Sequence, residues 1–177
     1  MNKTEELLEN LEQDYKDNIE SIKRTFKKLK KKPPKTFDYF VQEQHEEVFE
    51  KVDCLSCGEC CKSLGPNITD LDIRHMAKGL KMKPAKFTEQ YIEMDEDDNF
   101  VFNTMPCPFL MPDNYCMIYD HRPKACREYP HTDRRKFSQL LGITELNIKT
   151  CPAAMEVSKA IVKEFGAEYV KVIRTQK

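Results

Sequence analysis

The chain has 177 residues, of which 33% are charged and 40% are hydrophobic, and its formal net charge is -1. This length is enough for one domain with a helical extension, and so small a net charge gives no global attraction to nucleic acid or to an anionic membrane. No apolar run approaches the roughly 20 residues of a membrane span, and the acidic N-terminus lacks the apolar stretch of a signal peptide, so we expect a cytoplasmic protein without membrane or nucleic-acid partners.

The first predicted element is a long amphipathic helix over residues 3–32. Its apolar residues recur at spacings of three and four, which places them on one helical face: Leu8, Leu11, Tyr15, Ile19, Ile22, Phe26 and Leu29. Lysines crowd its end and Pro33 and Pro34 stop it. The basic stretch from Lys23 to Lys35 contains no acidic residue. We interpret it as a solvated helix end rather than a surface for nucleic acid or an acidic partner, because its only aromatic residue, Phe26, belongs to the apolar face.

Three further helices are expected in the first half of the chain. The second helix covers residues 36–51, and with the first it would make an antiparallel hairpin over the cysteine-rich domain. Thr69 can cap a helix whose third residue is Asp72 and which ends near Gly79. Another short helix is predicted over residues 84–92.

The next segment is expected to be extended. The acidic run 95–98 lacks the glycine and the final glutamate of a calcium loop, so we interpret it as an exposed turn. Residues 100–102 are prone to β-structure, and residues 112–114 are a turn signal between two apolar stretches. We predict a small hairpin that carries Cys107 on one arm and Cys116 on the other.

The last third of the chain is predicted to be helical. Pro123 breaks the chain and leaves Cys126 on a short turn or helix, and residues 132–149 should form helical turns and loop. A last helix opens at Cys151 and stops at Gly166. The expected fold is therefore mainly α with a small β-hairpin (α+β): a compact, metal-organised cysteine-rich domain preceded by a helical hairpin.

Eight cysteines dominate the chemistry of the chain, and four of them fall within the segment CLSCGECC at residues 54–61. In a reducing compartment, clustered cysteines bind metal or perform redox chemistry more often than they form disulfides. Neighbouring Cys60 and Cys61 would point about 100° apart in a helix, which favours two centres or one polynuclear centre bridged by the pair. The full set suffices for two sites of four thiolates: Cys54, Cys57, Cys60, Cys61, Cys107, Cys116, Cys126 and Cys151.

Zinc and iron are both compatible with this set. Zinc fits closed four-thiolate sites, while Cys-x2-Cys-x2-Cys is part of a bacterial iron–sulfur pattern that Cys61 interrupts. Buried thiolates need cations and hydrogen-bond donors nearby. His131, five residues after Cys126, is a further candidate ligand or donor. Five of the basic residues within four positions of a cysteine are candidates to supply the charge: Lys62, Arg122, Lys124, Arg127 and Lys149.

The chain resembles the CxxCxxCC family of cysteine-cluster proteins, also called the YkgJ family, which is described as zinc- or iron-chelating. The resemblance covers residues 50–155 and rests on five segments in order: CLSCGECC, ITDLDIRHMAKGL, PCPFL, CMIYDHRPKACREYP and the CP at Cys151. It implies that all eight cysteines belong to the metal-binding set. We expect a helical hairpin over residues 1–50, a metal-binding domain over 51–155, and a C-terminal helix over 156–177 that packs on the same core.

The leading hypothesis is a cytoplasmic protein that chelates zinc or iron through its eight cysteines. An alternative is an iron–sulfur oxidoreductase. Some relatives are called flagellin lysine N-methylases, and a protein-lysine methylase is a second alternative, although no glycine-rich loop for S-adenosylmethionine is evident. In a third alternative, the metal only stabilises the fold, and the apolar stripe from Leu8 to Leu29 binds a protein partner. No catalytic residue is assigned.

Overall fold

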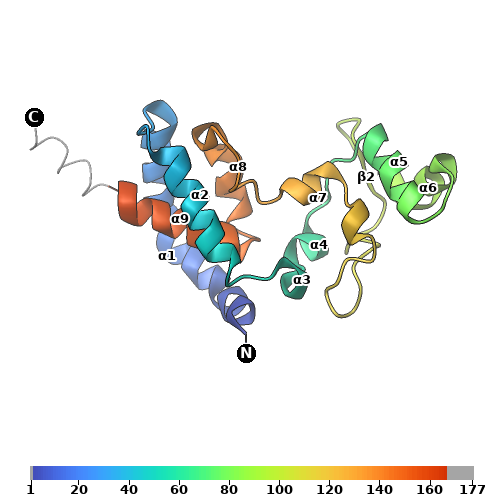
Figure 1. Ribbon diagram of the computed structural model, residues 1–177, viewed down its shortest axis with the longest axis horizontal. Helices are drawn as coiled ribbons and strands as arrows, with labels where there is room; N and C mark the ends of the chain where they lie inside the picture. Colours follow the sequence, from blue (N-terminus) through green and yellow to red (C-terminus); the bar gives the residue numbers. More distant parts are fainter. Residues whose placement is uncertain (1, 167–177) are drawn as a thin grey trace, which may run out of the picture. The chain divides into compact units, whose positions relative to one another are not determined.

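The computed structural model describes residues 2–166, whose contacts divide the chain into two units (Figure 1). The helical unit comprises Met1–Asp53 and Pro130–Lys177, and the cysteine-rich unit comprises Cys54–Tyr129. The predicted class, mainly helical with one small antiparallel hairpin, is confirmed over the described residues. The predicted domain boundaries at residues 50 and 155 were drawn from the family resemblance and stay predictions. None of the described helices is long and apolar enough to cross a membrane.

Helix α1 (Lys3–Lys31) has the extent that its apolar spacing predicts. The Asn2 side chain accepts from the Glu5 amide, and the Glu5 carboxylate accepts from the Asn2 amide, so the two residues form a capping box. Four of the seven residues of the predicted stripe are buried. Leu8, Tyr15 and Ile19 are only partly buried, and Leu7 is buried where Leu8 was expected. The buried apolar residues of this helix are Leu7, Leu11, Ile22, Phe26 and Leu29.

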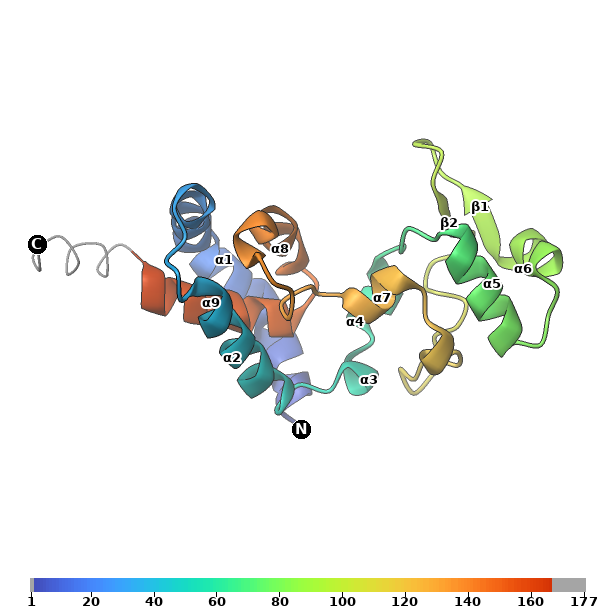
Figure 2. The ribbon, with the colours of Figure 1, turned by 45° about the horizontal axis from the view of Figure 1, so that its top comes forward.

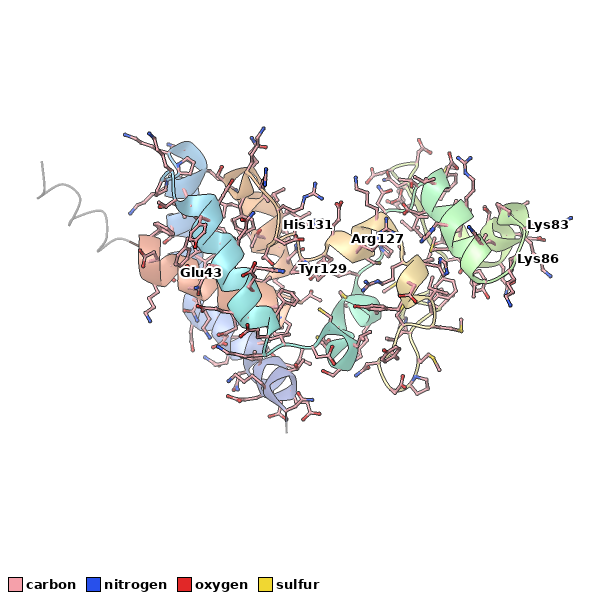
Figure 3. The ribbon with its side chains drawn as sticks, viewed as in Figure 1. Glu43, Lys83, Lys86, Arg127, Tyr129 and His131 are labelled. Atoms are coloured by element: carbon pink, nitrogen blue, oxygen red, sulfur yellow. The ribbon has the colours of Figure 1, made fainter. Side chains whose placement is uncertain are left out.

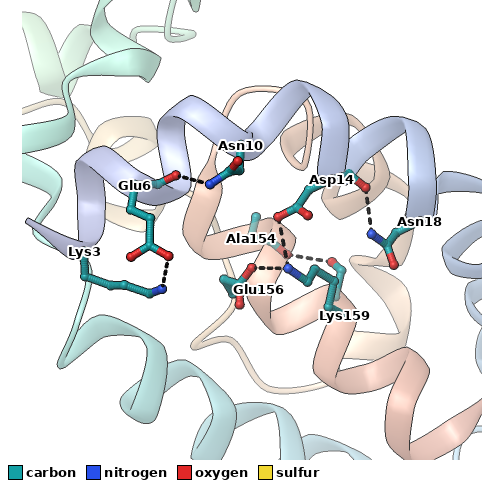
Figure 4. Close-up of polar contacts among 9 residues, drawn as sticks. Lys3, Glu6, Asn10, Asp14, Asn18, Ala154, Glu156 and Lys159 are labelled. Carbon is teal, nitrogen blue, oxygen red and sulfur yellow. Dashed lines mark hydrogen bonds and ion pairs between the residues drawn. The ribbon is translucent and has the colours of Figure 1, made fainter. Parts of the chain in front are cut away.

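Helix α9 (Pro152–Phe165) organises the helical unit, because it packs against both α1 and α2 (Phe37–Phe49). The Phe165 ring makes edge contacts with both Phe37 and Phe40 of α2, at centroid distances of 5.5 and 5.1 Å. On the other side, Lys159 Nζ reaches Asp14 of α1 at 3.0 Å while it also contacts Glu156 (Figure 4). The first two helices therefore each have α9 as their main partner, rather than one another.

Two short elements complete this unit, where helical turns and loop were predicted. They are η2 (Phe137–Gln139) and α8 (Leu141–Asn147), and both contact α1. Asp38 at the start of α2 accepts from the amides of Lys136 and Phe137, at 2.6 and 2.9 Å. These bonds fix the loop before η2 to the first turn of α2.

One half of the cysteine-rich unit is a small apolar core (Figure 2). Its elements are α5 (Asp70–Gly79), α6 (Pro84–Tyr91), β1 (Ile92–Met94) and β2 (Phe100–Phe102). The predicted capping box of Thr69 and Asp72 opens α5. Strands β1 and β2 pair with Ile92 opposite Phe102, and the acidic run 95–98 lies in the turn between them. The core buries Met76, Phe87, Phe102 and Phe109.

The hairpin predicted around residues 112–114 is formed only in part. Leu110 and Cys116 make an isolated antiparallel bridge, and the Met111 amide donates to the Tyr115 carbonyl at 2.8 Å. Strand pairing occurs earlier in the chain instead, between β1 and β2. The reason is that Pro106 and Pro108 flank Cys107 and lack the amide hydrogens that a strand arm there would need.

Five cysteines lie on three helices of only four or five residues: α3 (Cys54–Cys57), α4 (Glu59–Ser63) and α7 (Lys124–Glu128). Over the part of the chain that the structure describes, none of these helices has an extensive interface with another helix or strand. Cys57 is their only buried residue. Helices this short are unstable alone in water, so something other than apolar packing must hold them.

Candidate metal centre

Gly58 joins α3 to α4 through a left-handed backbone, with φ of +65°. A Cβ at this position would lie 3.1 Å from the Cβ of Asn114, so both the backbone and the available space favour glycine. Asn114 also donates from Nδ2 to the Ser56 carbonyl at 3.0 Å. The loop before Cys116 is thereby held against the CLSCGECC segment.

The adjacent thiols of Cys60 and Cys61 lie close together, with their Sγ atoms 4.0 Å apart. Two sulfurs of a tetrahedral zinc site are separated by about 3.8 Å when each Zn–S bond is about 2.3 Å. The pair can therefore contact a single ion, and the two separate centres that the sequence favoured are not required by this geometry.

Four thiols from three parts of the unit act on one another: Cys61, Cys107, Cys116 and Cys126. Burial, together with negative charge at Cys61 and Cys116, raises the pKa of Cys126 to about 12 and that of Cys107 to about 11. The Cys107 amide also donates to the Cys61 carbonyl at 2.8 Å. Within residues 2–166, however, no three Cys, His, Asp or Glu side chains are gathered into a ready-made metal site. The thiols share a neighbourhood without forming a closed coordination sphere.

Cys61 differs from the thiols around it. Its pKa is lowered to about 7, chiefly by the hydrogen bond with Cys60 and further by the charges of Arg122 and Lys62, which together outweigh burial. Burial raises the pKa of Cys57 and of Cys116. Near neutral pH, Cys61 is therefore partly thiolate, while Cys57, Cys107, Cys116 and Cys126 keep their protons.

Arg122 supplies positive charge to this neighbourhood. Its Cζ lies 3.4 Å from the centroid of the Tyr119 ring, in the cation–π position. Its Nε is buried and has no hydrogen-bond partner among the residues described. Its charge lowers the pKa of Cys61 and opposes the pKa rise of Cys116. A guanidinium with an unused donor beside several thiols fits the charge requirement of a thiolate-rich centre, and sulfur donors fit both zinc and iron.

The other predicted cations have different surroundings. Lys62 pairs with Glu59 at 2.8 Å and also acts on Cys57 and Cys61. Lys124 is 4.0 Å from Glu128, and Lys149 lies over the Tyr15 ring in the helical unit. Arg127 of α7 (Figure 3) donates from Nη1 to the Arg122 carbonyl. Arg122 and Lys62 are thus two of the five predicted cations, and their charges act on cysteines.

Cys151 has a structural role in the helical unit. It is the N-cap of α9, where its Sγ accepts from the Ala154 amide at 3.4 Å, and its side chain is buried. Of the seven cysteines in the cysteine-rich unit, Cys54 is exposed. His131, the candidate histidine, lies in the helical unit with a φ of 69°. Ligand roles for all eight cysteines stay a prediction.

Asp72 has a second function that its sequence context did not indicate. Besides capping α5, its carboxylate accepts from the Lys124 amide at 2.8 Å, at the start of the helix that carries Cys126. The sequence alone indicates the cap of α5, because Thr69 and Asp72 are three residues apart. The bond to Lys124 spans 52 residues, and no local pattern reveals it.

Replacing Asp72 by alanine is expected to lower the free energy of unfolding of the metal-loaded protein by about 2 kcal/mol. The change removes the carboxylate of the capping box, which accepts from the Thr69 amide, and leaves the Lys124 amide without its acceptor; each loss costs about 1 kcal/mol. Chemical denaturation measures the difference. Asp70→Ala is the matched control, since Asp70 is an exposed residue of the same helical turn; equal losses in the two variants would contradict the role of the Lys124 bond.

Comparison with known proteins gives one match. A family model named CxxCxxCC, with the description "putative zinc- or iron-chelating domain", matches residues 53–152, a segment that contains all eight cysteines. No curated protein and no solved structure matches the chain.

Proposed function

Because this chain belongs to the CxxCxxCC family of zinc- or iron-chelating domains, we propose that its cysteines hold zinc or iron and that this metal organises residues 54–129. The observation that carries the proposal is the state of α3, α4 and α7. These short helices bear five cysteines and have no extensive interface with another element in the described chain. A metal bound by their thiolates would supply the contacts that apolar packing does not.

The thiols that act on one another are the best candidates for the centre. Cys61, Cys107, Cys116 and Cys126 form its middle, and Cys57 and Cys60 adjoin Cys61. Ligand roles for Cys54 and Cys151 rest on the family resemblance alone. A bound zinc ion would supply a structural crosslink, and iron would add redox chemistry. Such a centre suits a reducing compartment, and we place the protein in the cytoplasm.

Elemental analysis and an absorption spectrum of anaerobically purified protein test this function. We expect at least about one equivalent of zinc or iron per chain, as one site of four thiolates requires. A colourless protein with zinc would support the structural role, and a visible band that bleaches on reduction would support an iron–sulfur centre. Less than one equivalent of any transition metal, with eight free thiols and an unchanged fold, would contradict the proposal.

Zinc loading of the metal-free protein is expected to release protons. Ligating thiols must ionise, and burial holds the pKa values of Cys57, Cys107, Cys116 and Cys126 above the ordinary range. These thiols keep their protons below their raised pKa values, so zinc affinity should fall as the pH falls. Cys61, with a pKa of about 7, contributes to this dependence only near and below neutrality.

Calorimetry in two buffers of different ionisation enthalpy counts the released protons. At pH 7.5 we expect about three or four per zinc ion, one for each ligating thiol that is still protonated. Zinc binding without proton release would show that the ligands are not these buried thiols.

A further inference from the structure

Two basic runs that are distant in the sequence belong to one region of the helical unit. Residues 23–35 contain eight lysines and arginines, and residues 134–136 are Arg-Arg-Lys. The second run leads directly into η2, which packs against both α1 and α2. Asp38 fixes it there by accepting from the amides of Lys136 and Phe137. We call residues 23–35 and 134–136 together the basic surface.

The charges of residues 23–35 are available to a partner. Every lysine and arginine in the basic surface is exposed. Over the described chain, no ion pair involves a basic side chain of residues 23–35. The nearby carboxylate of Asp38 already accepts two backbone amides. A local excess of about ten positive charges thus sits on a protein whose net charge is only -1.

The surroundings of the basic surface favour a nucleic acid over a membrane. The apolar face of α1 is buried within the helical unit, so this basic helix has no apolar face to insert into a bilayer. Tyr39 on α2 lies four residues after Lys35 in the chain and is 71% exposed. An exposed aromatic side chain close in the chain to clustered cations suits a phosphate backbone and its unstacked bases.

We propose that the basic surface binds the phosphate backbone of a nucleic acid without reading its sequence. This revises the interpretation of residues 23–35 as a solvated helix end, which rested on one run alone. Lysine and arginine contacts to phosphates give affinity and position but carry no sequence information. The surface contains no cysteine, so its activity is separable from metal binding.

Fluorescence anisotropy with the full-length, metal-loaded protein tests the proposal. The probes are a labelled 20-nucleotide single strand of mixed sequence and its duplex, at about 50 and 200 mM salt. If about three phosphates are neutralised, the Kd should rise on the order of 20- to 40-fold between these salt concentrations. Sequence changes in the probe should leave the Kd unchanged.

A triple variant identifies the surface: Lys27→Gln, Lys31→Gln and Arg135→Gln. Its matched control is Lys78→Gln, Lys83→Gln and Lys86→Gln, which removes three exposed charges from α5 and α6 and from the residue preceding α6; Figure 3 labels Lys83 and Lys86. The first variant should bind at least about tenfold more weakly, with a salt slope smaller by about two, and the control should bind like the parent. Thermal melting should be the same for all three proteins.

Four results would overturn the proposal. The first two are oligonucleotide binding that does not depend on salt, and an equal loss of affinity in the control variant. The other two are competition by polyglutamate that equals competition by an oligonucleotide of the same charge, and binding to anionic phospholipid vesicles in preference to the oligonucleotides. Polyglutamate competition would indicate an acidic protein partner, and vesicle binding a membrane surface.

Discussion

Removing the metal is expected to release α3, α4 and α7 while the rest of the protein stays folded. In hydrogen exchange followed by mass spectrometry, peptides covering residues 54–63 and 124–128 should lose protection after anaerobic treatment with a strong chelator. The expected loss is about a thousandfold, equivalent to about 4 kcal/mol, which is well within the binding free energy of a structural zinc ion.

The contrast between the two halves of the cysteine-rich unit is the physical reason. Helices α5 and α6 and the β-hairpin share a core in which Met76, Phe87 and Phe109 are almost fully buried. Helices α3, α4 and α7 contribute only Cys57 to the buried residues. Apolar burial stabilises the first group without any metal, at about 25 cal/mol per Å² of buried surface, whereas the second group buries little apolar surface among the described residues.

Peptides from α1 and α9 serve as the internal reference, because their protection depends on contacts within the helical unit. Adding zinc back should restore protection at residues 54–63 and 124–128. Unchanged protection after complete metal removal would mean that other contacts hold the three short helices. Loss of protection across α5 and α6 as well would mean that the apolar core also depends on the metal.

Local patterns in the sequence predicted most of the helices. The cap Thr69 lies three positions from Asp72, so α5 begins where that pattern indicates, and α1 has the extent that its apolar spacing predicts. The β-hairpin was misplaced because its first strand, residues 92–94, was not predicted, and residue 92 was assigned to the preceding helix. A three-residue strand is too short to show the alternation on which strand prediction depends.

Long-range contacts explain what the sequence could not show about the site. The spacing of the cysteines predicts the candidate ligands. The sequence does not distinguish among the five candidate cations, whereas the structure shows Arg122 over the Tyr119 ring with a buried Nε. Likewise, the sequence separation between residues 23–35 and 134–136 concealed their common region of the helical unit. Such pairings are set by tertiary packing and have no local signature.

Replacing Arg122 by glutamine is expected to weaken zinc binding by about 10- to 100-fold, the usual effect of removing an outer-shell partner of a metal ligand. A centre with several thiolates buries negative charge, and Arg122 is the positively charged residue whose Nε is buried without a hydrogen-bond partner among the residues described. Competition with a chromophoric chelator measures the affinity. Lys124→Gln is the control, since its side chain is 64% exposed and faces Glu128; equal effects of the two changes would contradict a specific role for Arg122.

The metal-free protein offers a second readout that folding alone would not change. The charge of Arg122 contributes to the lowered pKa of Cys61, so Arg122→Gln should raise that pKa and slow alkylation of Cys61 at pH 7. Arg122→Lys keeps the charge but loses the planar contact with the Tyr119 ring, and should fall between the parent and the glutamine variant. Tyr119→Phe keeps the ring and should change neither measurement, whereas Tyr119→Leu should resemble Arg122→Lys. This ranking of the variants distinguishes the effect of the positive charge of Arg122 from the effect of its position, because only the position depends on the Tyr119 ring.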